Sequence, residues 1–494
     1  MLNEMTVDSS YSYLSQAITQ CEQAIETKPD DPEKWKTTFQ DLGNLLQGRA
    51  EFERSMVWHS LALDSQPNLA EVYCQLGELH ILEKNWSAAL TSFHNALEYL
   101  PNSARIYSSL AQINNQLQRK AAEIDCWYKA TQLEPKLVNN NGYYKLAKAL
   151  QQVGKIDEAV ECYQKAIAGG EGIVAAFFDL GEIYLKQRKL KEARAIYERI
   201  LAAEPTEARA SYKLGTIHLQ QRSFEQAIEY FRQTIKNAPD FPWAYRDLVK
   251  TFLILQKWDE AISTCYAILN LVEEYPWVYS YLGNALREKG RLPQAAGNFQ
   301  KACEHRGWKR CVLNDYFFTS DVFTHRISMW AKHFKPLKEQ AIAVLEVGCY
   351  QGMSACWILD EMLSDSKSTL TCIDSNFEPQ FKQNIFKTGS ESKVTFLEGN
   401  IHQLMADCTP NSFDLINLQD RCKLSQHVEE NTRLAWELLK PGGFMVFSSY
   451  GWLNLSDVRQ NPKVGIDRFL DSVKDRWQLV HLYPQMFQLI IRKL

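Results

Sequence analysis

We expect an α-helical repeat array followed by an α/β domain whose sheet is mostly parallel. Three observations predict this fold. Small residues return about every 34 residues over the first three hundred positions, and strand and helix patterns alternate after residue 340. A buried strand, a glycine turn and a helix start follow one another at residues 344–354, where the α/β part begins. A length of 494 residues accommodates both parts.

The repeat is defined by one small residue per unit, and the steps are of 34 residues except for one of 36. These positions are Gly43, Gly77, Ala111, Ala147, Gly181, Gly215, Val249 (a larger residue in the same place) and Gly283. Proline follows most units, as expected if each unit is a pair of short helices that cross closely. The pattern resembles the tetratricopeptide repeat over residues 10–305, as a leading half repeat and eight repeats that form an α-solenoid. Residues 1–9 are expected to be a flexible N-terminus.

The resemblance implies a concave groove that binds a protein or peptide. Groove positions five residues into each unit carry no lysine, so we do not expect a carboxylate clamp of the kind that grips chaperone tails. Tyr144, Phe178 and Tyr212 would form an aromatic stripe across three neighbouring repeats. Packing between repeats and peptide binding are both open explanations of this stripe.

Residues 306–340 are rich in aromatic side chains and are predicted to be a connector or lid helix. The α/β domain then spans residues 341–494. Helical segments separate the first five expected strands, which favours a parallel sheet, whereas a short link joins the last two as an antiparallel hairpin. Lys440-Pro441-Gly442-Gly443 is expected to stop a helix before the fifth strand. The expected strands are 342–347, 369–373, 394–397, 413–418, 444–447, 478–483 and 487–492.

The first strand and the turn after it carry glycines that suit a ligand site, although glycine turns of this kind also occur in α/β proteins that bind nothing. Glu346, Gly348 and Gly352 form the pattern E-x-G-x-x-x-G, and Asp374 ends the second strand, where a carboxylate can accept both hydroxyls of a ribose. These residues resemble the class I S-adenosylmethionine-dependent methyltransferase fold, a mostly parallel seven-stranded sheet with an antiparallel C-terminal hairpin. The resemblance implies S-adenosyl-L-methionine as cofactor, and implies that Asn400 meets its adenine.

Residues 314–494 more closely resemble a bacterial branch of small methyltransferases related to metal-assisted sugar O-methyltransferases. The segments that carry this resemblance are N-D-Y-F-F-T-S-D-V-F at 314–323 and R-L-A-W-E-L-L-K-P-G-G at 433–443. In those relatives acidic residues after the fourth and fifth strands hold a divalent ion. Here Gln419, Ser448 and Ser449 stand in the corresponding places, and serine is a poor magnesium ligand. We therefore expect no metal.

A hydroxyl acceptor also needs a base within hydrogen-bond reach. The candidates near the carboxyl ends of the strands are Asp420, Tyr450 and His402. Each has a plain structural alternative: a loop acid, a packed tyrosine and a histidine on a helix surface.

Composition and charge limit the partners and the cellular location that we expect. A net charge of −4 gives no reason to expect nucleic acid or a membrane surface as partner. The twelve cysteines contain no C-x-x-C pair, and neither a signal peptide nor a membrane span is evident, so a cytoplasmic location is expected. Two functions remain: a methyltransferase whose repeats recruit a protein or carrier-bound substrate, and a non-catalytic interaction scaffold with a degenerate methyltransferase domain.

Overall fold

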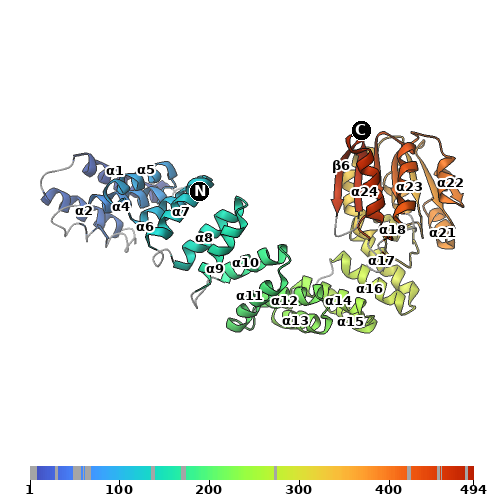
Figure 1. Ribbon diagram of the computed structural model, residues 1–494, viewed down its shortest axis with the longest axis horizontal. Helices are drawn as coiled ribbons and strands as arrows, with labels where there is room; N and C mark the ends of the chain where they lie inside the picture. The colour runs from blue at the N-terminus through green and yellow to red at the C-terminus, as the bar shows by residue number, and fades with distance from the viewer. Residues whose placement is uncertain are drawn as a thin grey trace. The chain divides into compact units, whose positions relative to one another are not determined.

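A computed structural model describes residues 8–27, 32–47, 57–58, 61, 68–134, 139–168, 174–271, 275–419, 424–452, 457, 459–483 and 488–494 (Figure 1). The chain forms two compact units, Met1–Leu214 and Gly215–Leu494. Within the described ranges, no helix combines the length and the apolar character that crossing a membrane requires.

The described residues of the first unit form a succession of helices. They are α1 (Asp8–Thr27), α2 (Pro32–Gln47), α4 (Leu69–Leu82), α5 (Trp86–Tyr99), α6 (Ala104–Gln116), α7 (Lys120–Leu133), α8 (Asn139–Gln152), α9 (Ile156–Ala166), α10 (Val174–Lys186), α11 (Leu190–Ala203) and α12 (Ala208–Gln220), which continues into the second unit.

Glycine and aromatic residues explain how closely the two helices of a repeat approach each other. A Cβ atom added at Gly77 would lie 2.6 Å from the ring of Phe93, and one added at Gly283 would lie 2.5 Å from the ring of Phe299. Twelve residues after the defining position, six units carry a fully buried alanine: Ala89, Ala159, Ala193, Ala227, Ala261 and Ala295. Ring and small residue thus fill one inter-helix space, and the predicted helical repeat array is confirmed.

The turn inside each repeat shares one backbone feature. A residue in the left-handed region ends the first helix at Lys84, Gln118, Gly154, Arg188, Arg222, Gln256 and Gly290, with φ between 57° and 81°. The backbone N–H of this left-handed residue closes the turn, as when Lys84 N donates to Ile81 O at 3.0 Å. A recurrent left-handed residue is a common way to end a helix and release the chain into the next one.

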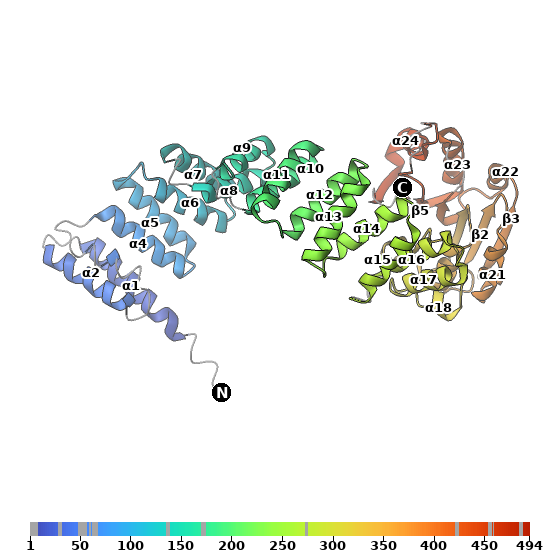
Figure 2. The same ribbon diagram turned by 90° about the horizontal axis from the view of Figure 1, so that it is seen from below.

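The second unit begins with further helices and continues into the aromatic-rich segment. Figure 2 shows helices α13 to α17 side by side in chain order. Their bounds, with the short helices that follow, are α13 (Phe224–Asn237), α14 (Pro242–Ile254), α15 (Trp258–Leu269), α16 (Pro276–Glu288), α17 (Leu292–Glu304), α18 (Arg310–Leu313), η1 (Thr324–Arg326), α19 (Ile327–His333) and η2 (Lys335–Leu337).

Buried aromatic side chains join residues 306–340 to the sheet domain. Trp308 Nε1 and Tyr316 Oη donate to the carboxylate of Asp360, at 2.8 and 3.0 Å. Trp330 Nε1 donates to Gln488 Oε1 at 3.2 Å. Because all three rings are fully buried, this segment is built into the core beside the sheet.

The sheet has seven strands in the order β3-β2-β1-β4-β5-β7-β6. Strands β1 to β5 pair in parallel, and β7 pairs antiparallel with both β5 and β6. The predicted mostly parallel sheet with an antiparallel C-terminal hairpin is therefore confirmed. The strands are β1 (Ala343–Val347), β2 (Thr369–Asp374), β3 (Val394–Glu398), β4 (Phe413–Leu418), β5 (Leu439–Phe447), β6 (Trp477–Tyr483) and β7 (Gln488–Lys493).

Helices cover the sheet, and α23 and α24 lie together in both views (Figures 1 and 2). Leu345, Ile416 and Met445 from neighbouring strands meet Trp436 and Phe469 from these helices in one core. The helices of the domain, with its remaining 3-10 turns, are α20 (Met353–Glu361), α21 (Pro379–Lys387), η3 (Glu391–Lys393), α22 (Ile401–Ala406), α23 (Ser425–Leu438), α24 (Pro462–Ser472) and η4 (Lys474–Arg476).

The fifth strand differs from its expected range. Helix α23 ends at Leu438, as the Lys-Pro-Gly-Gly sequence predicts, but β5 starts at Leu439 and runs through that sequence. The register shifts between the pairs Phe413↔Leu439 and Leu415↔Phe444. The two glycines therefore form an irregularity within a strand, which residue preferences alone do not distinguish from a loop.

Candidate active site

The turn after β1 is a tight loop held by the end of β2. Gly348, Tyr350 and Gly352 all have positive φ, at 82°, 49° and 84°. The backbone N–H of Cys349 donates to Asp374 Oδ2 at 2.7 Å. A Cβ at Gly352 would lie 2.8 Å from the ring of Phe381. Gly348 and Gly352 occupy positions where the backbone turns with positive φ. Gly352 also lets the start of helix α20 approach Phe381 of α21 closely.

Glu346 is a fully buried carboxyl group on β1. Ser354 Oγ donates to its Oε1, whereas its Oε2 has no hydrogen-bond partner in the described structure. Burial raises the pKa of the Glu346 carboxyl to about 8, the nearby Asp374 adds to the rise, and Ser354 and Arg326 oppose it. An unpaired buried carboxyl oxygen is costly, so it marks a place for a hydrogen-bond donor or a cation.

Asp374 and Asn400 stand at the ends of β2 and β3. Asp374 is buried, and its Oδ1 accepts long hydrogen bonds from Ser375 Oγ and the backbone N–H of Asn376, at 3.4 and 3.3 Å. Asn400 Oδ1 accepts the backbone N–H of Gln403 at 3.1 Å and so caps α22. Asp374 thus holds the glycine turn through Oδ2, and its Oδ1 makes only long hydrogen bonds. Asn400 caps the helix that follows it.

The segment after α18 lies against the glycine turn through paired amide contacts. Asn384 Nδ2 donates to the backbone oxygens of Phe317 and Gln351, each at 3.0 Å. Gln351 Nε2 donates to Thr319 Oγ1 at 2.8 Å, and the Thr319 N–H donates back to Gln351 Oε1 at 2.7 Å. These contacts set the position of residues 317–319 relative to the turn.

A cavity of about 950 Å³ opens at the carboxyl edge of the sheet. The sheet domain contributes Tyr350 after β1, Gln419 after β4, and Ser448 and Ser449 after β5. Trp452, further along the chain after β5, lines the cavity too, and residues of the connecting segment and of helices α14 and α16 supply the remaining lining. All these residues belong to the second unit. The cavity therefore lies over β1, β4 and β5, next to the turn on which Glu346 and Asp374 converge.

Arg326 is the most buried cation of this cavity wall. It donates from Nη2 to the backbone oxygen of Ser448 at 2.8 Å and from Nε to His325 Nε2 at 3.1 Å. Its Nη1 has no hydrogen-bond partner in the described structure. Burial lowers the pKa of Arg326 to about 10, which leaves it charged at neutral pH, and burial lowers the pKa of His325 to about 4, which leaves it neutral.

Ser448 belongs to a buried polar network. Its Oγ donates to Asn417 Oδ1 at 2.9 Å and accepts from Gln488 Nε2 at 3.2 Å. This hydroxyl joins β4, β5 and β7. Among the described residues, no group of three or more His, Cys, Asp or Glu side chains is placed to hold a metal ion.

The three candidate bases occupy different surroundings. His402 lies exposed on α22 and does not line the cavity. Tyr450 Oη donates to Asp467 Oδ1 at 2.7 Å, and its ring packs at the edge of the hydrophobic core. Burial raises the pKa of Tyr450, and its hydrogen bond to Asp467 adds to the rise. Asp420 lies outside the described residues.

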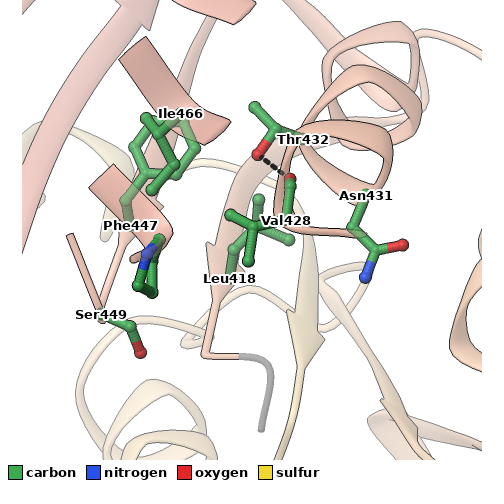
Figure 3. A pocket seen from close by; sticks show the side chains of 8 residues that line it. Leu418, Val428, Asn431, Thr432, Phe447, Ser449 and Ile466 are labelled. Atoms are coloured by element: carbon green, nitrogen blue, oxygen red, sulfur yellow. Dashed lines mark hydrogen bonds between the residues drawn. The ribbon is translucent and has the colours of Figure 1, made fainter. Parts of the chain in front are cut away.

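A much smaller apolar pocket of about 30 Å³ lies beside the cavity (Figure 3). Leu418 and Phe447 come from strand ends, Val428 and Thr432 from α23, and Ser449 lines both spaces. Thr432 Oγ1 donates to the backbone oxygen of Val428 at 2.6 Å, so its hydroxyl is satisfied within the helix. A space of this size holds one or two waters and no cofactor.

Sequence reasoning missed the residues that the connecting segment brings to the cavity. Asp321 lies within the 314–323 motif, but nothing in a single sequence separates it from Asp315, which is outside the cavity lining. His325 and Arg326 follow directly, in a stretch read as aromatic packing. Two adjacent basic residue types, His-Arg, inside a segment rich in aromatic side chains were the available signal.

Comparison with known proteins supports both parts of the chain. Residues 345–450 match the family described as a methyltransferase domain, and residues 144–208 match the tetratricopeptide repeat. Residues 186–266 also match subunit 3 of the anaphase-promoting complex, cyclosome. These matches fall on the segments where the sheet edge and the helix pairs have been described.

Individual relatives match over parts of their length. The chain is 27% identical over 123 residues to malonyl-[acyl-carrier protein] O-methyltransferase of Haemophilus ducreyi, which is 25% of this chain and 46% of that protein. It is 33% identical over 84 residues to small glutamine-rich tetratricopeptide repeat-containing protein 2 of Mycosarcoma maydis, which is 17% of this chain and 23% of that protein.

A solved structure, YrrB, described as a tetratricopeptide repeat protein with an unusual peptide-binding site, is similar with a TM-score of 0.32 and 22% identity, over 35% of this chain and 89% of that one. The chain spans less than half the length of the curated relatives that it matches. Taken with the fold, the family matches identify a chain of tetratricopeptide repeats followed by a methyltransferase domain.

Proposed function

We propose that this protein is an S-adenosylmethionine-dependent methyltransferase whose repeats recruit a protein or carrier-bound substrate. The observation that carries the proposal is the glycine turn after β1, fastened to Asp374 by the 2.7 Å hydrogen bond from Cys349 and bordered by the unpaired Oε2 of Glu346. A bent, glycine-lined backbone between two buried carboxyl groups fits a ligand that has a ribose and an ammonium group.

The residues present fit the cofactor as follows. Asp374 would accept hydrogen bonds from the ribose hydroxyls, Glu346 would receive the ammonium of the methionine part, and Gly348 and Gly352 would let the backbone approach. Asn400 would meet the adenine through the part of its amide that does not cap α22. When bound, the cofactor supplies a sulfonium methyl group, which passes to an acceptor oxygen or nitrogen while the S–C electron pair stays on sulfur and the acceptor loses a proton.

The protein's own contribution is to hold the acceptor in line and to take that proton. Asp420, Tyr450 and His402 stay our proposed bases. Asp420 follows cavity-lining Gln419 in the chain, which favours it over the other two. A Tyr450 hydroxyl that already donates to Asp467, and a His402 outside the cavity lining, would both have to move.

Calorimetry with S-adenosylmethionine and S-adenosylhomocysteine tests the proposal on the full chain. Wild type should bind both, and Asp374→Ala should weaken binding about a hundredfold, because it removes charged hydrogen-bond acceptors worth roughly 1.5–3 kcal/mol each. Asp407→Ala is the matched control, since Asp407 is exposed at the end of α22, and it should bind as wild type does. Absence of binding by the wild type would contradict the proposal.

The alternative is a non-catalytic interaction scaffold. The observation that favours it is the Ser448 network: the resemblance implies a metal-holding acid in this place, and the Ser448 hydroxyl found there is bonded to Asn417 and Gln488. Under this alternative the glycine turn either binds the cofactor without catalysis or binds no ligand. The repeats alone then carry the function, which is to bind other proteins. Cofactor binding that persists without methylation of any protein captured by the repeats would support it.

A further inference from the structure

We propose that the last two repeats form the outer wall of the acceptor site, and that this wall selects an acceptor with a flat ring and an anionic group, either carboxylate or phosphate. The proposal rests on the proposed methyltransferase function. It assigns specificity to helices α14 and α16, which contribute Trp243, Arg246, Lys250, Trp277, Tyr281 and Asn284 to the cavity over β1, β4 and β5.

The lining residues occupy equivalent positions in the two repeats. Trp243 and Trp277 are 34 residues apart, and so are Lys250 and Asn284. Within α14 and within α16 the lining residues are spaced by three and four, so each helix presents one face. The same face of two successive repeats thus looks into the methyltransferase cavity.

The residue types on this face differ between these two repeats and the other six. The first of its positions is tryptophan only at Trp243 and Trp277 among the eight units. In the other six units, taken in chain order, it is Thr37, Glu71, Arg105, Asn141, Ala175 and Arg209. Large aromatic residues therefore appear on this face where it borders the sheet edge, and core packing does not account for Trp243, which is 49% exposed.

Charge on the cavity wall favours an anion. The lining includes the cations Arg246, Lys250, Arg306 and Arg326 against the anions Asp247 and Asp321, while His325 is neutral. Asp321 is occupied by its own segment, because both of its oxygens accept hydrogen bonds from Phe323 or Thr324. Arg246 donates from Nε to Oδ1 of Asp247 at 2.9 Å, and these two charges offset each other, so the net positive charge of the wall rests on Lys250, Arg306 and Arg326. In a partly enclosed space such a charge acts strongly.

At the inner end, Arg326 supplies a built contact for an anionic group. It is 6% exposed, and its Nη1 has no hydrogen-bond partner among the described residues, while its other nitrogens are fixed on Ser448 and His325. A guanidinium held on two sides, whose third nitrogen is buried and still has hydrogens to donate, is preorganised for one oxygen anion.

At the outer end, aromatic faces and cations occur together. The Arg246 guanidinium lies 4.6 Å from the centre of the Trp243 ring, and the rings of Trp277 and Tyr281 meet at 5.8 Å. Such a surface accepts a flat ring by stacking, and its cations attract a charged substituent. The cavity volume of about 950 Å³ is at the upper end for small-molecule sites, so it admits an acceptor residue together with part of its carrier.

Ring probes of equal size and different charge test this inference. With the full chain saturated by S-adenosylhomocysteine, binding of benzoate, phenyl phosphate, benzyl alcohol and benzylamine is measured by saturation-transfer NMR. We expect at least one anion to bind five- to tenfold more tightly than benzyl alcohol, and benzylamine to bind most weakly. A preference for benzoate or for phenyl phosphate identifies the anionic group as carboxylate or phosphate.

Variants locate the binding. Arg246→Gln/Lys250→Gln should weaken the anions five- to tenfold and leave benzyl alcohol unchanged, whereas Trp243→Ala/Trp277→Ala should weaken all ring probes. The matched control is Arg232→Gln/Lys257→Gln, which removes the same charge from exposed residues of α13 and of the turn before α15, outside the cavity lining. It should bind the probes as wild type does.

Calorimetry of the cofactor on each variant separates this inference from the proposed function. Cofactor binding should be unchanged in both double variants, since neither touches the glycine turn. The inference is overturned if benzyl alcohol binds as well as the anions, or if the control variant loses as much affinity as Arg246→Gln/Lys250→Gln. Failure of the wild type to bind the cofactor would instead overturn the methyltransferase proposal.

Discussion

The two halves of the site are built in different ways. The half over β1 and β2 comes from about thirty consecutive residues, and its groups hold one another: Cys349 with Asp374, and Glu346 with Ser354. The half over β4 and β5 is assembled from α14, α16, the connecting segment and the residues that follow β4 and β5. Residues more than 200 positions apart, such as Trp243 and Ser449, line the same cavity.

This difference separates a compact cofactor half from a variable acceptor half. Local hydrogen bonds and glycine geometry fix the first half, so a change there should affect stability and cofactor binding together. Packing between repeats and sheet domain fixes the second, so a change there should alter acceptor binding and leave cofactor binding unchanged. Four predictions follow this division, in order of decreasing effect.

The largest effect is expected at Gly352. Alanine there would need φ near 84° and would place its Cβ 2.8 Å from the Phe381 ring, so Gly352→Ala should destabilise the domain by about 2–4 kcal/mol and abolish measurable cofactor binding. Denaturant unfolding and calorimetry measure the two effects. Gly389→Ala is the control, because Gly389 also has positive φ but has nothing within 4 Å of an added Cβ. It should lose only about 1–2 kcal/mol. Equal losses in both variants would show that the close approach to Phe381 does not matter.

The contrast also shows what sequence can predict. The repeat, the sheet and the turn with Glu346, Gly348, Gly352 and Asp374 were all predictable, because each depends on spacing along one short stretch. Arg326 and Trp243 were not, since their role depends on which distant elements the fold brings together. A tryptophan at position 243 is compatible both with packing in a repeat groove and with lining a cavity. Only the sheet edge that the fold places beside it distinguishes the two.

A smaller effect, with a distinct pH dependence, is expected at Glu346. The pKa of this carboxyl rises from an ordinary value of 4.5 to about 8 on folding. The folded state therefore binds more protons than the unfolded state between these pH values, and the stability of the free protein falls as pH rises through this window. Glu346→Gln cannot titrate, so its melting temperature should exceed that of the wild type increasingly from pH 5 to pH 8.

The same substitution should weaken the cofactor about ten- to hundredfold at pH 8, because the charged acceptor for the ammonium is lost. In wild type the affinity should increase from pH 6 to pH 8 as Glu346 ionises, and in Glu346→Gln this increase should be reduced. Calorimetry across this pH range measures both. Ser364→Ala is a control that removes a polar side chain from an exposed residue of the same domain. A pH profile of affinity that is identical in wild type and Glu346→Gln would remove Glu346 from the cofactor site.

A third prediction compares equivalent glycines in the two units. Gly77→Ala and Gly283→Ala place a Cβ 2.6 and 2.5 Å from Phe93 and Phe299, so each should cost about 1–3 kcal/mol of unfolding free energy. Gly283 precedes Asn284 in the helix that lines the acceptor cavity, whereas Gly77 lies in the first unit. Only Gly283→Ala should weaken the anionic ring probes, and neither should change cofactor binding. Weaker probe binding by Gly77→Ala would mean that repeat stability alone sets acceptor affinity.

The smallest effect is expected at two turns within repeats, one turn taken from each of the two units. Gly154 and Gly290 have φ of 81° and 73°, and an added Cβ would meet nothing within 4 Å at either place. Alanine should therefore cost only the left-handed backbone strain of about 1 kcal/mol, since lysine, glutamine and arginine already occupy this conformation in five other repeats. Gly297→Ala, inside α17 with open space around it, should act in the opposite direction and stabilise by up to about 1 kcal/mol. Thermal unfolding of the three variants gives the signs, and unchanged cofactor and probe binding would establish that stability losses of this size do not reach either half of the site.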